Sequence, residues 1–321
     1  MKNDPLLQPY QLKHLEIKNR LMTSAHEPSY AENGIPKERY RLYHVERAKG
    51  GIGLTMTAGS AIVSPDSPST FGNLHAYKDE IVPWLKKITK ECHHYGSKVM
   101  IQITHLGRRT NWNHSDWLPV VSASQVREPA HRAFPKEAED WDIERIIQDY
   151  AEAAERMKEA NMDGVEIEAY GHFLDSFWSP ATNKRIDEFG GNLDNRVKFS
   201  IKVINAIRKA VGNKFIIGVR MVADEDWKEG LSKKDGLEIA KKLIKTKKVD
   251  FLNIIRGHID TDAALSKVIP IQGMASSPHL EFAGEIKQKT SFPIFHASKI
   301  NDVATARYSV LSGKLDMVGM T

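Results

Sequence analysis

IERIIQDYAEAAERM (residues 143–157) and GVEIE (residues 164–168) together have the pattern of an amphipathic helix that leads into a short strand. Apolar side chains recur at three- and four-residue spacing in the first segment, for example at Ile143, Ile146 and Tyr150, which places them on one helical face. The second segment has the length of a buried strand in a parallel sheet. A helix packed against such a strand is the repeating unit of an α/β fold.

The same unit recurs along the chain. Apolar runs predict eight strands, at Arg20–Ala25, Ile52–Ala58, Lys98–Ile103, Gly164–Glu168, Phe215–Arg220, Phe251–Ile255, Pro293–His296 and Asp316–Met320. Further helical stripes are expected between them, at residues 82–95 and 197–211. This alternation predicts one α/β domain over residues 1–321, a parallel eight-stranded (β/α)₈ TIM barrel. An open doubly wound sheet is the alternative.

Two segments depart from this rhythm. Residues 104–141 contain three prolines and no clear periodicity, so we expect a lid or pocket wall there. Trp112, Trp117 and Phe134 argue against a disordered insertion. No eighth helix follows the last predicted strand, so the last helix of the barrel is missing from this sequence. We therefore expect the natural protein to continue beyond Thr321, with residues 1–321 as its N-terminal part.

Charge and cysteine content exclude several classes of protein. The chain has 46 basic and 41 acidic residues, interspersed along its length, and a net charge of +5. Nucleic acid is not an expected partner, because there is no basic tail or basic block with interleaved aromatics. Cys92 is the only cysteine, which excludes disulfides and thiolate clusters within this chain and favours a reducing cytoplasm. No metal site is predicted, and no apolar run is long enough to cross a membrane.

The residues at the predicted strand ends lie where barrel enzymes place their chemistry. They include Ser24, Ala25, His26, Glu27, Gly59, Gln102, His105, Glu168, Tyr170, His172, Arg220, His258, Ser298 and Lys299. Arg220 closes the apolar run FIIGVR, and a buried guanidinium needs an acceptor. The N1–C2=O edge of a flavin would suit it, and an ion pair with Glu168 is the alternative.

A phosphate site is expected at Ala297, Ser298 and Lys299. These residues precede a helical stretch beginning near Asn301, so backbone N–H groups, a hydroxyl and a cation converge there. Barrels often bind phosphate after their seventh and eighth strands. A plain helix cap at Asn301 or Asp302 is compatible with this prediction.

The segment SPATNKRIDEFGGNLDNR (residues 179–196) is the most specific motif in the chain. It is supported by QITHLGR at 102–108, by Asn19-Arg20 and by KIND at 299–302. With these motifs the sequence resembles the old yellow enzyme family of FMN-dependent oxidoreductases over its whole length. It is most similar to the branch that contains trimethylamine dehydrogenase, the dimethylglycine and N-methylproline demethylases, and 2,4-dienoyl-CoA reductase.

The resemblance implies an FMN site along the strand ends. The positions that would contact FMN are Ser24, Ala25, His26, Gly59, Gln102, Arg220, Ala297, Ser298, Lys299, Met320 and Thr321. In this branch a 4Fe–4S centre and nucleotide-binding domains often follow the barrel, so a cluster is expected only in a region beyond residue 321. The resemblance also makes a homo-oligomer an expectation, whereas the electron acceptor stays unnamed.

Three departures from the family's ene-reductases indicate the substrate. Phe173 stands where those enzymes have a tyrosine proton donor, Glu168 and Gly171 replace the usual anchoring pair, and Glu27 lies beside the flavin position. Carboxylates would repel an enolate but would stabilise an ammonium or iminium group. We therefore expect oxidative demethylation of a small N-methylated amine or amino acid, with hydride transfer to flavin N5.

The expected roles follow from this chemistry. Glu168, His172 and His258 are the expected catalytic residues, and Glu27, His105, Tyr170, Phe173 and Trp178 the expected substrate contacts. Tyr170, Phe173, Trp178 and Trp227 would supply a partial aromatic cage. For Glu168, a salt bridge with Arg220 or Arg256 is the alternative. The two rival functions are reduction of an activated C=C bond, with His172 or His258 as proton donor, and a non-catalytic ligand-binding barrel.

Overall fold

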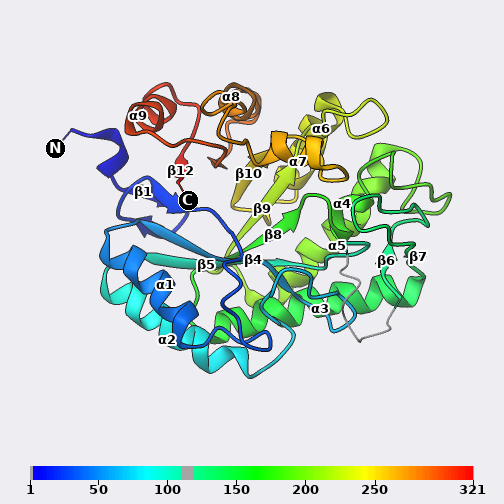
Figure 1. The fold of residues 1–321 in the computed structure, drawn as a ribbon, viewed down its shortest axis with the longest axis horizontal. Coiled ribbons are helices and arrows are strands. Elements are labelled where there is room, and N and C mark those ends of the chain that lie inside the picture. The colour runs from blue at the N-terminus through cyan, green and yellow to red at the C-terminus, as the bar shows by residue number, and fades with distance from the viewer. Residues whose placement is uncertain (1–2, 110–118, 321) are drawn as a thin grey trace.

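The computed structural model describes residues 3–109 and 119–320, and a closed barrel of eight parallel strands lies at its centre (Figure 1). In order around the barrel, the strands are β10 (Phe251–Ile255), β11 (Ile294–His296), β12 (Met317–Gly319), β3 (Leu21–Thr23), β4 (Leu54–Ile62), β5 (Lys98–Thr104), β8 (Gly164–Ala169) and β9 (Ile216–Val222). All eight predicted strands are confirmed, within a few residues at their ends. Closure between β9 and β10 rules out the open sheet.

Helices lie around the outside of the barrel (Figure 1). They are α1 (Glu38–Lys49), α2 (Ile81–His94), α3 (Asp140–Glu159), α4 (Phe173–Ser176), α5 (Leu193–Val211), α6 (Lys233–Lys245), α7 (Asp262–Val268), α8 (Leu280–Thr290) and α9 (Val303–Leu311), with a 3-10 turn at Pro5–Leu7. The apolar stripe of α3 is buried as predicted, and a capping box between Glu139 and Asp142 starts that helix. β12 is the last element among the described residues.

A hairpin closes the N-terminal end of the barrel. Its strands, β1 (Tyr10–Leu12) and β2 (Leu15–Ile17), alternate buried and exposed residues. The buried side chains pack on the barrel interior, where the rings of Phe251 and Phe295 stack with their centroids 4.2 Å apart. This apolar plug fills one end, so polar side chains can meet a ligand along the barrel axis at the other end.

The long connection after β5 contains a small two-stranded sheet of β6 (Val121–Ser122) and β7 (Lys136–Glu137). Phe134 is exposed. Trp112 and Trp117, which were expected to help form the lid, lie outside the described residues.

β4 carries an irregularity that shapes the open end of the barrel. Its register with β5 shifts between Thr57 and Ala61, and Ala58 and Ser60 have positive φ values of 55° and 69°. A Cβ at Gly59 would lie 2.7 Å from the backbone nitrogen of Glu27. Only glycine therefore allows the ends of β3 and β4 to approach this closely.

No helix within residues 3–109 and 119–320 is both long enough and apolar enough to cross a membrane.

Candidate functional site

A cavity of about 1120 Å³ opens at the C-terminal ends of the barrel strands. It brings together most of the residues expected at the site, namely Ser24, Ala25, His26, Glu27, Gly59, Gln102, Glu168, Tyr170, His172, Arg220, Ala297, Ser298, Lys299 and Met320. Thr321 lies outside the described residues. Segments from both ends of the sequence therefore line one chamber.

Arg220 projects from β9 into this cavity. In the register of the barrel it lies opposite Glu168 on β8 and Asn253 on β10. Its Nη1 is buried and has no hydrogen-bond partner among the described residues. Its guanidinium carbon lies 5.9 Å from the centre of the Tyr170 ring. A half-buried cation with a buried, unused donor is suited to an anionic ligand edge.

A buried polar layer lies beside Arg220. The Gln102 Nε2 donates to Glu166 Oε1 (2.7 Å), and the Asn253 Nδ2 donates to Glu166 Oε2 (2.8 Å). The backbone N–H of Ser60 donates to Gln102 Oε1 (3.1 Å), which fixes that amide. Burial raises the pKa of Glu166, against the opposing charge of Arg220. Sequence reasoning missed Glu166 and Asn253, although Glu166 shares the inward face of β8 with Glu168.

Glu168 is held as an anion at the cavity wall. The Ser60 hydroxyl donates to its Oε2 (2.7 Å), and the Nδ1 of His172 lies 3.2 Å from the same oxygen. Burial raises the pKa of Glu168, but the contacts with His172 and Ser60 and the charge of Arg220 outweigh it, so the pKa falls below its ordinary value. Glu168 therefore pairs with His172, and no ion pair to Arg220 or Arg256 is found among the described residues.

Glu27 differs from Glu168. Burial raises its pKa from 4.5 to about 8, and its Oε1 accepts a hydrogen bond from the Ser29 backbone. Its Oε2 is buried and lacks a partner among the described residues. Glu27 is thus mainly protonated near pH 7, unlike the carboxylate that the sequence analysis considered.

His26 is fixed by two contacts. Its Nδ1 lies 2.9 Å from the carbonyl oxygen of Ser24, which can only accept, so Nδ1 carries the proton. Its Nε2 then accepts a hydrogen bond from the hydroxyl of Tyr43. Burial lowers the pKa of His26, so the ring is neutral at neutral pH.

The loop after β11 is arranged partly as expected for a phosphate site. The Ser298 hydroxyl is buried and has no partner among the described residues. Gly319 packs so closely on this loop that a Cβ there would lie 2.4 Å from the Cβ of Ala297. Asp302 caps α9. The ammonium group of Lys299, however, donates to backbone carbonyls of the 271–274 segment, such as Gln272 (2.8 Å), so its side chain braces that segment.

Four residues expected at the site do not line this cavity. Phe173 and Trp178 are fully buried: Phe173 packs against Phe177 and Phe199, and the Trp178 indole N–H donates to Ser200 (2.6 Å).

His105 and His258 face other partners. The His105 side chain is buried against Asp66, with Nε2 and Oδ1 3.1 Å apart. His258 stacks on Trp227 and lines a small hollow of about 20 Å³ that His172 also lines. Of the four rings expected in the aromatic cage, Tyr170 alone lines the main cavity.

Sequence reasoning also missed part of the wall. Arg109 and His131 line the cavity from the long connection after β5, together with Ala130. The connection was expected to form a pocket wall, but its lack of periodicity gave no signal for which side chains would face inward.

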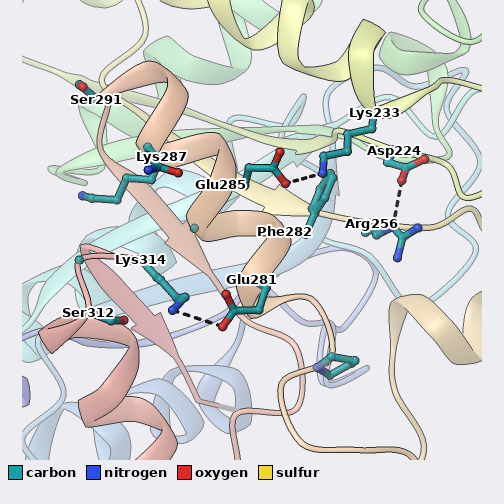
Figure 2. Close-up of a pocket in the computed structure, with 14 residues that line it drawn as sticks. Asp224, Lys233, Arg256, Glu281, Phe282, Glu285, Lys287, Ser291, Ser312 and Lys314 are labelled. Atoms are coloured by element: carbon teal, nitrogen blue, oxygen red, sulfur yellow. Dashed lines mark hydrogen bonds and ion pairs between the residues drawn. The ribbon is translucent and has the colours of Figure 1, made fainter.

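A second hollow, of about 1010 Å³, lies on the outer face beside α8. Figure 2 shows that its charged side chains pair with one another: Lys233 with Glu285, Arg256 with Asp224, and Lys314 with Glu281. These pairs leave the ionic groups satisfied. The barrel cavity, whose wall carries partnerless buried atoms, is therefore the better candidate site.

The polar atoms that line the cavity suit a flavin mononucleotide. The free Nη1 of Arg220 would face the electron-rich pyrimidine edge, and the free hydroxyl of Ser298 would face a phosphate at the opposite end. No cluster of three or more His, Cys, Asp or Glu side chains suited to a metal occurs in the described part of the chain.

Comparisons with known proteins agree with this geometry. The chain is 63% identical over 321 residues to a probable N-methylproline demethylase of Rhizobium meliloti, covering 100% of this chain and 47% of that protein. It is 44% identical to a multifunctional alkene reductase/demethylase of Caballeronia cordobensis, covering 99% of this chain and 47% of the relative. It is 39% identical to an N,N-dimethylglycine/sarcosine dehydrogenase of Chromohalobacter salexigens, covering 99% of this chain and 46% of that protein.

The chain thus spans about half the length of these curated relatives. Among solved structures, a 2-naphthoyl-CoA reductase complex superimposes with a TM-score of 0.91 at 25% identity, covering 99% of this chain and 50% of the other. The NADH:flavin oxidoreductase / NADH oxidase family model matches residues 5–321. The chain therefore belongs to this family of flavin-dependent oxidoreductases, the old yellow enzyme family.

Proposed function

We propose that this barrel binds FMN across its strand ends and oxidatively demethylates a small N-methylated amine or amino acid. Arg220 would contact the pyrimidine edge of the flavin, the backbone around Gly59 would lie against its ring, and Ser298 would bind its phosphate. The partnerless buried atoms of Arg220 and Ser298 support this orientation. Lys299 would act by fixing the loop, because its ammonium group binds carbonyls.

When bound, FMN supplies a two-electron acceptor that takes a hydride from the N-methyl carbon. The substrate nitrogen must be unprotonated for this transfer, and loss of the hydride leaves an iminium ion. Water adds to the iminium carbon, and the adduct breaks down to formaldehyde, the demethylated amine and one proton. The protein's task is to bind the cationic amine, remove its proton and stabilise the positive charge that returns on the iminium.

The single observation that carries the proposal is the buried, ionised Glu168 in the cavity wall. A carboxylate at this position attracts an ammonium or iminium group and disfavours an enolate. The ring of Tyr170 adds a face that can contact a cation. His172 lines the same cavity, and its Nδ1 lies 3.2 Å from Glu168, so its other ring nitrogen, Nε2, would be the group that accepts the proton of the substrate.

The relatives support the same chemistry. Two of them are named for demethylation or dehydrogenation of N-methylated amino acids, and a third for demethylation as well as alkene reduction. Because these relatives are about twice as long, the proposal concerns the half-reaction that this barrel carries.

Anaerobic mixing tests the proposal. The FMN-loaded protein should lose its visible flavin absorbance when N-methylproline or dimethylglycine is added, and formaldehyde should appear in equal amount to the flavin reduced. A protein that is colourless once unbound FMN has been removed, or a flavin that none of these amines bleaches, would overturn it.

Alkene reduction is the second candidate, and Glu27 is the observation that favours it. Glu27 lines the cavity, and a carboxyl group that is protonated near pH 7 can donate a proton to a substrate carbon. Ene-reductases use a tyrosine hydroxyl for this step, and Phe173, which stands at that position, has none. Reoxidation of pre-reduced flavin by cyclohexenone would support this activity. Loss of that reoxidation in Glu27→Gln, with reduction by amines retained, would assign the proton to Glu27.

A further inference from the structure

We infer that Arg109 and His131 form a carboxylate-binding subsite in the cavity, so that the preferred substrates are zwitterionic N-methyl amino acids. This inference rests on the proposed function and narrows its substrate class. None of the contacts described for the flavin uses either residue.

The cavity is polarised outside the part assigned to flavin. Glu168 and Arg109 both line it, so the cavity carries a carboxylate and a guanidinium. Tyr170 lines the same cavity: burial raises its pKa, and the charges of Arg220, Glu168 and Arg109 act on its hydroxyl. A molecule that contacts the Tyr170 ring can therefore reach a negative group and a positive group at once.

The Arg109 guanidinium is buried and held in one orientation. Its Nη1 donates to Glu128 Oε1 (3.1 Å), and its Nη2 donates to the carbonyl oxygen of Ile259. The Nδ1 of His131 lies 3.2 Å from Arg109 Nη1 and 3.2 Å from Glu128 Oε2. A guanidinium has five N–H donors, and the contacts named here use three of them, which leaves donors for the carboxylate of a ligand.

The cluster of Arg109 and His131 already binds one carboxylate, that of Glu128. Glu128 is 1% exposed at its side chain and balances one positive charge. An amino acid with an N-methylated ammonium group is complementary at both ends, with its cation at Glu168 and its anion at Arg109.

The rival interpretation is that Arg109 and Glu128 are only a structural ion pair. The two interpretations predict different results for a matched pair of substrates. N-methylproline and N-methylpyrrolidine have the same ring and the same N-methyl group, and they differ in the carboxylate. A subsite at Arg109 should make the acid bind more tightly by about tenfold to a hundredfold, the range expected for hydrogen bonds to a charged group.

The test measures flavin reduction with both compounds in the FMN-loaded wild type, Arg109→Gln and Arg109→Lys. We expect Arg109→Gln to raise the half-saturating concentration of N-methylproline to that of N-methylpyrrolidine and to leave the latter unchanged. Arg109→Lys should retain part of the preference. Arg132→Gln is the matched control, because Arg132 is exposed on the same connection and does not line the cavity.

A binding measurement separates this inference from the proposed function. Proline and pyrrolidine lack the N-methyl group, and their binding can be followed by perturbation of the oxidised flavin spectrum. If no amine bleaches the flavin, the proposed function fails, whereas tighter binding of proline that Arg109→Gln abolishes still supports the subsite. The subsite would be overturned if the wild type bound proline and pyrrolidine equally tightly, or if a preference for proline survived in Arg109→Gln.

Discussion

Arg220 and Glu166 show which site residues can be predicted from a sequence and which cannot. Arg220 was predicted because a guanidinium that closes an apolar run must have an acceptor, and the structure places it in the cavity with a free nitrogen. Glu166 was missed because a carboxylate inside a strand gives no sign of its partners. Phe173 was misplaced because Asp175 accepts the backbone N–H of His172 (2.9 Å) and starts α4 directly after β8, which turns Phe173 into the core.

Glu168→Gln should raise KM for a cationic amine about tenfold to a hundredfold, since the substitution removes the charge that pairs with the ammonium. The Ser60 hydrogen bond can persist in the amide, so folding should survive. Steady-state kinetics with N-methylproline would measure this. Reoxidation of reduced flavin by cyclohexenone, a neutral compound, serves as the control and should not be impaired. An unchanged KM would remove Glu168 from the substrate site.

Glu27→Gln should change how stability depends on pH. In the unfolded chain this carboxyl ionises near 4.5, whereas in the folded protein its pKa is about 8. The folded state therefore holds an extra proton between these values, and its stability falls as pH rises from about 4.5 to about 8. The amide of the variant cannot ionise, so its Tm relative to wild type should increase across this range. A constant difference from pH 5 to pH 9 would contradict the raised pKa.

Among the helices and strands, the periodicity of apolar residues predicted those that are long enough to show a repeating pattern. The eight strands and helices α2, α3 and α5 all carry apolar stripes or runs of sufficient length. The β1–β2 hairpin was not predicted, because three-residue strands are too short for a periodic signal. The irregularity of β4 was also invisible, since alanine and serine are not residue types that signal the positive φ values found at Ala58 and Ser60.

The hairpin should contribute to stability without touching the ligand. Ile17 is fully buried in the plug at the closed end of the barrel, and Ile17→Ala should cost about 2–5 kcal/mol in the free energy of unfolding. Denaturant unfolding would measure this. Glu16→Ala is the matched control on the same strand, because Glu16 is exposed and should change stability little. A large loss of FMN affinity in Ile17→Ala would show that the two ends of the barrel are not independent.

The whole molecule explains why the site could be only partly predicted. The cavity wall runs from Ser24 to Met320, and barrel closure brings these segments together. Once the alternation of strands and helices indicated a barrel, the strand-end residues followed from the rule that chemistry lies at that face. Arg109 and His131 did not follow, because their inward orientation depends on how an aperiodic connection folds over the barrel mouth.

FMN should stabilise the whole barrel by mass action. At a free concentration of about 100 times Kd, the gain is about 2.7 kcal/mol, which raises Tm by several degrees for a chain of this size. A thermal melt with increasing FMN would measure the shift. Riboflavin, which lacks the phosphate, should give a smaller shift at equal concentration, and Arg220→Met should reduce the shift with both. Equal shifts from FMN and riboflavin would contradict a phosphate site at Ser298.

The apolar plug formed by β1, β2 and the barrel interior also affects how small molecules reach the cavity. Because apolar side chains fill the N-terminal end of the barrel, the amine and a diffusible oxidant would both reach the flavin through the cavity at the C-terminal end. For the reaction proposed, we therefore expect the amine and the oxidant to react with the flavin in turn rather than together. Steady-state rates measured against amine at several concentrations of a small artificial oxidant should then give parallel reciprocal plots.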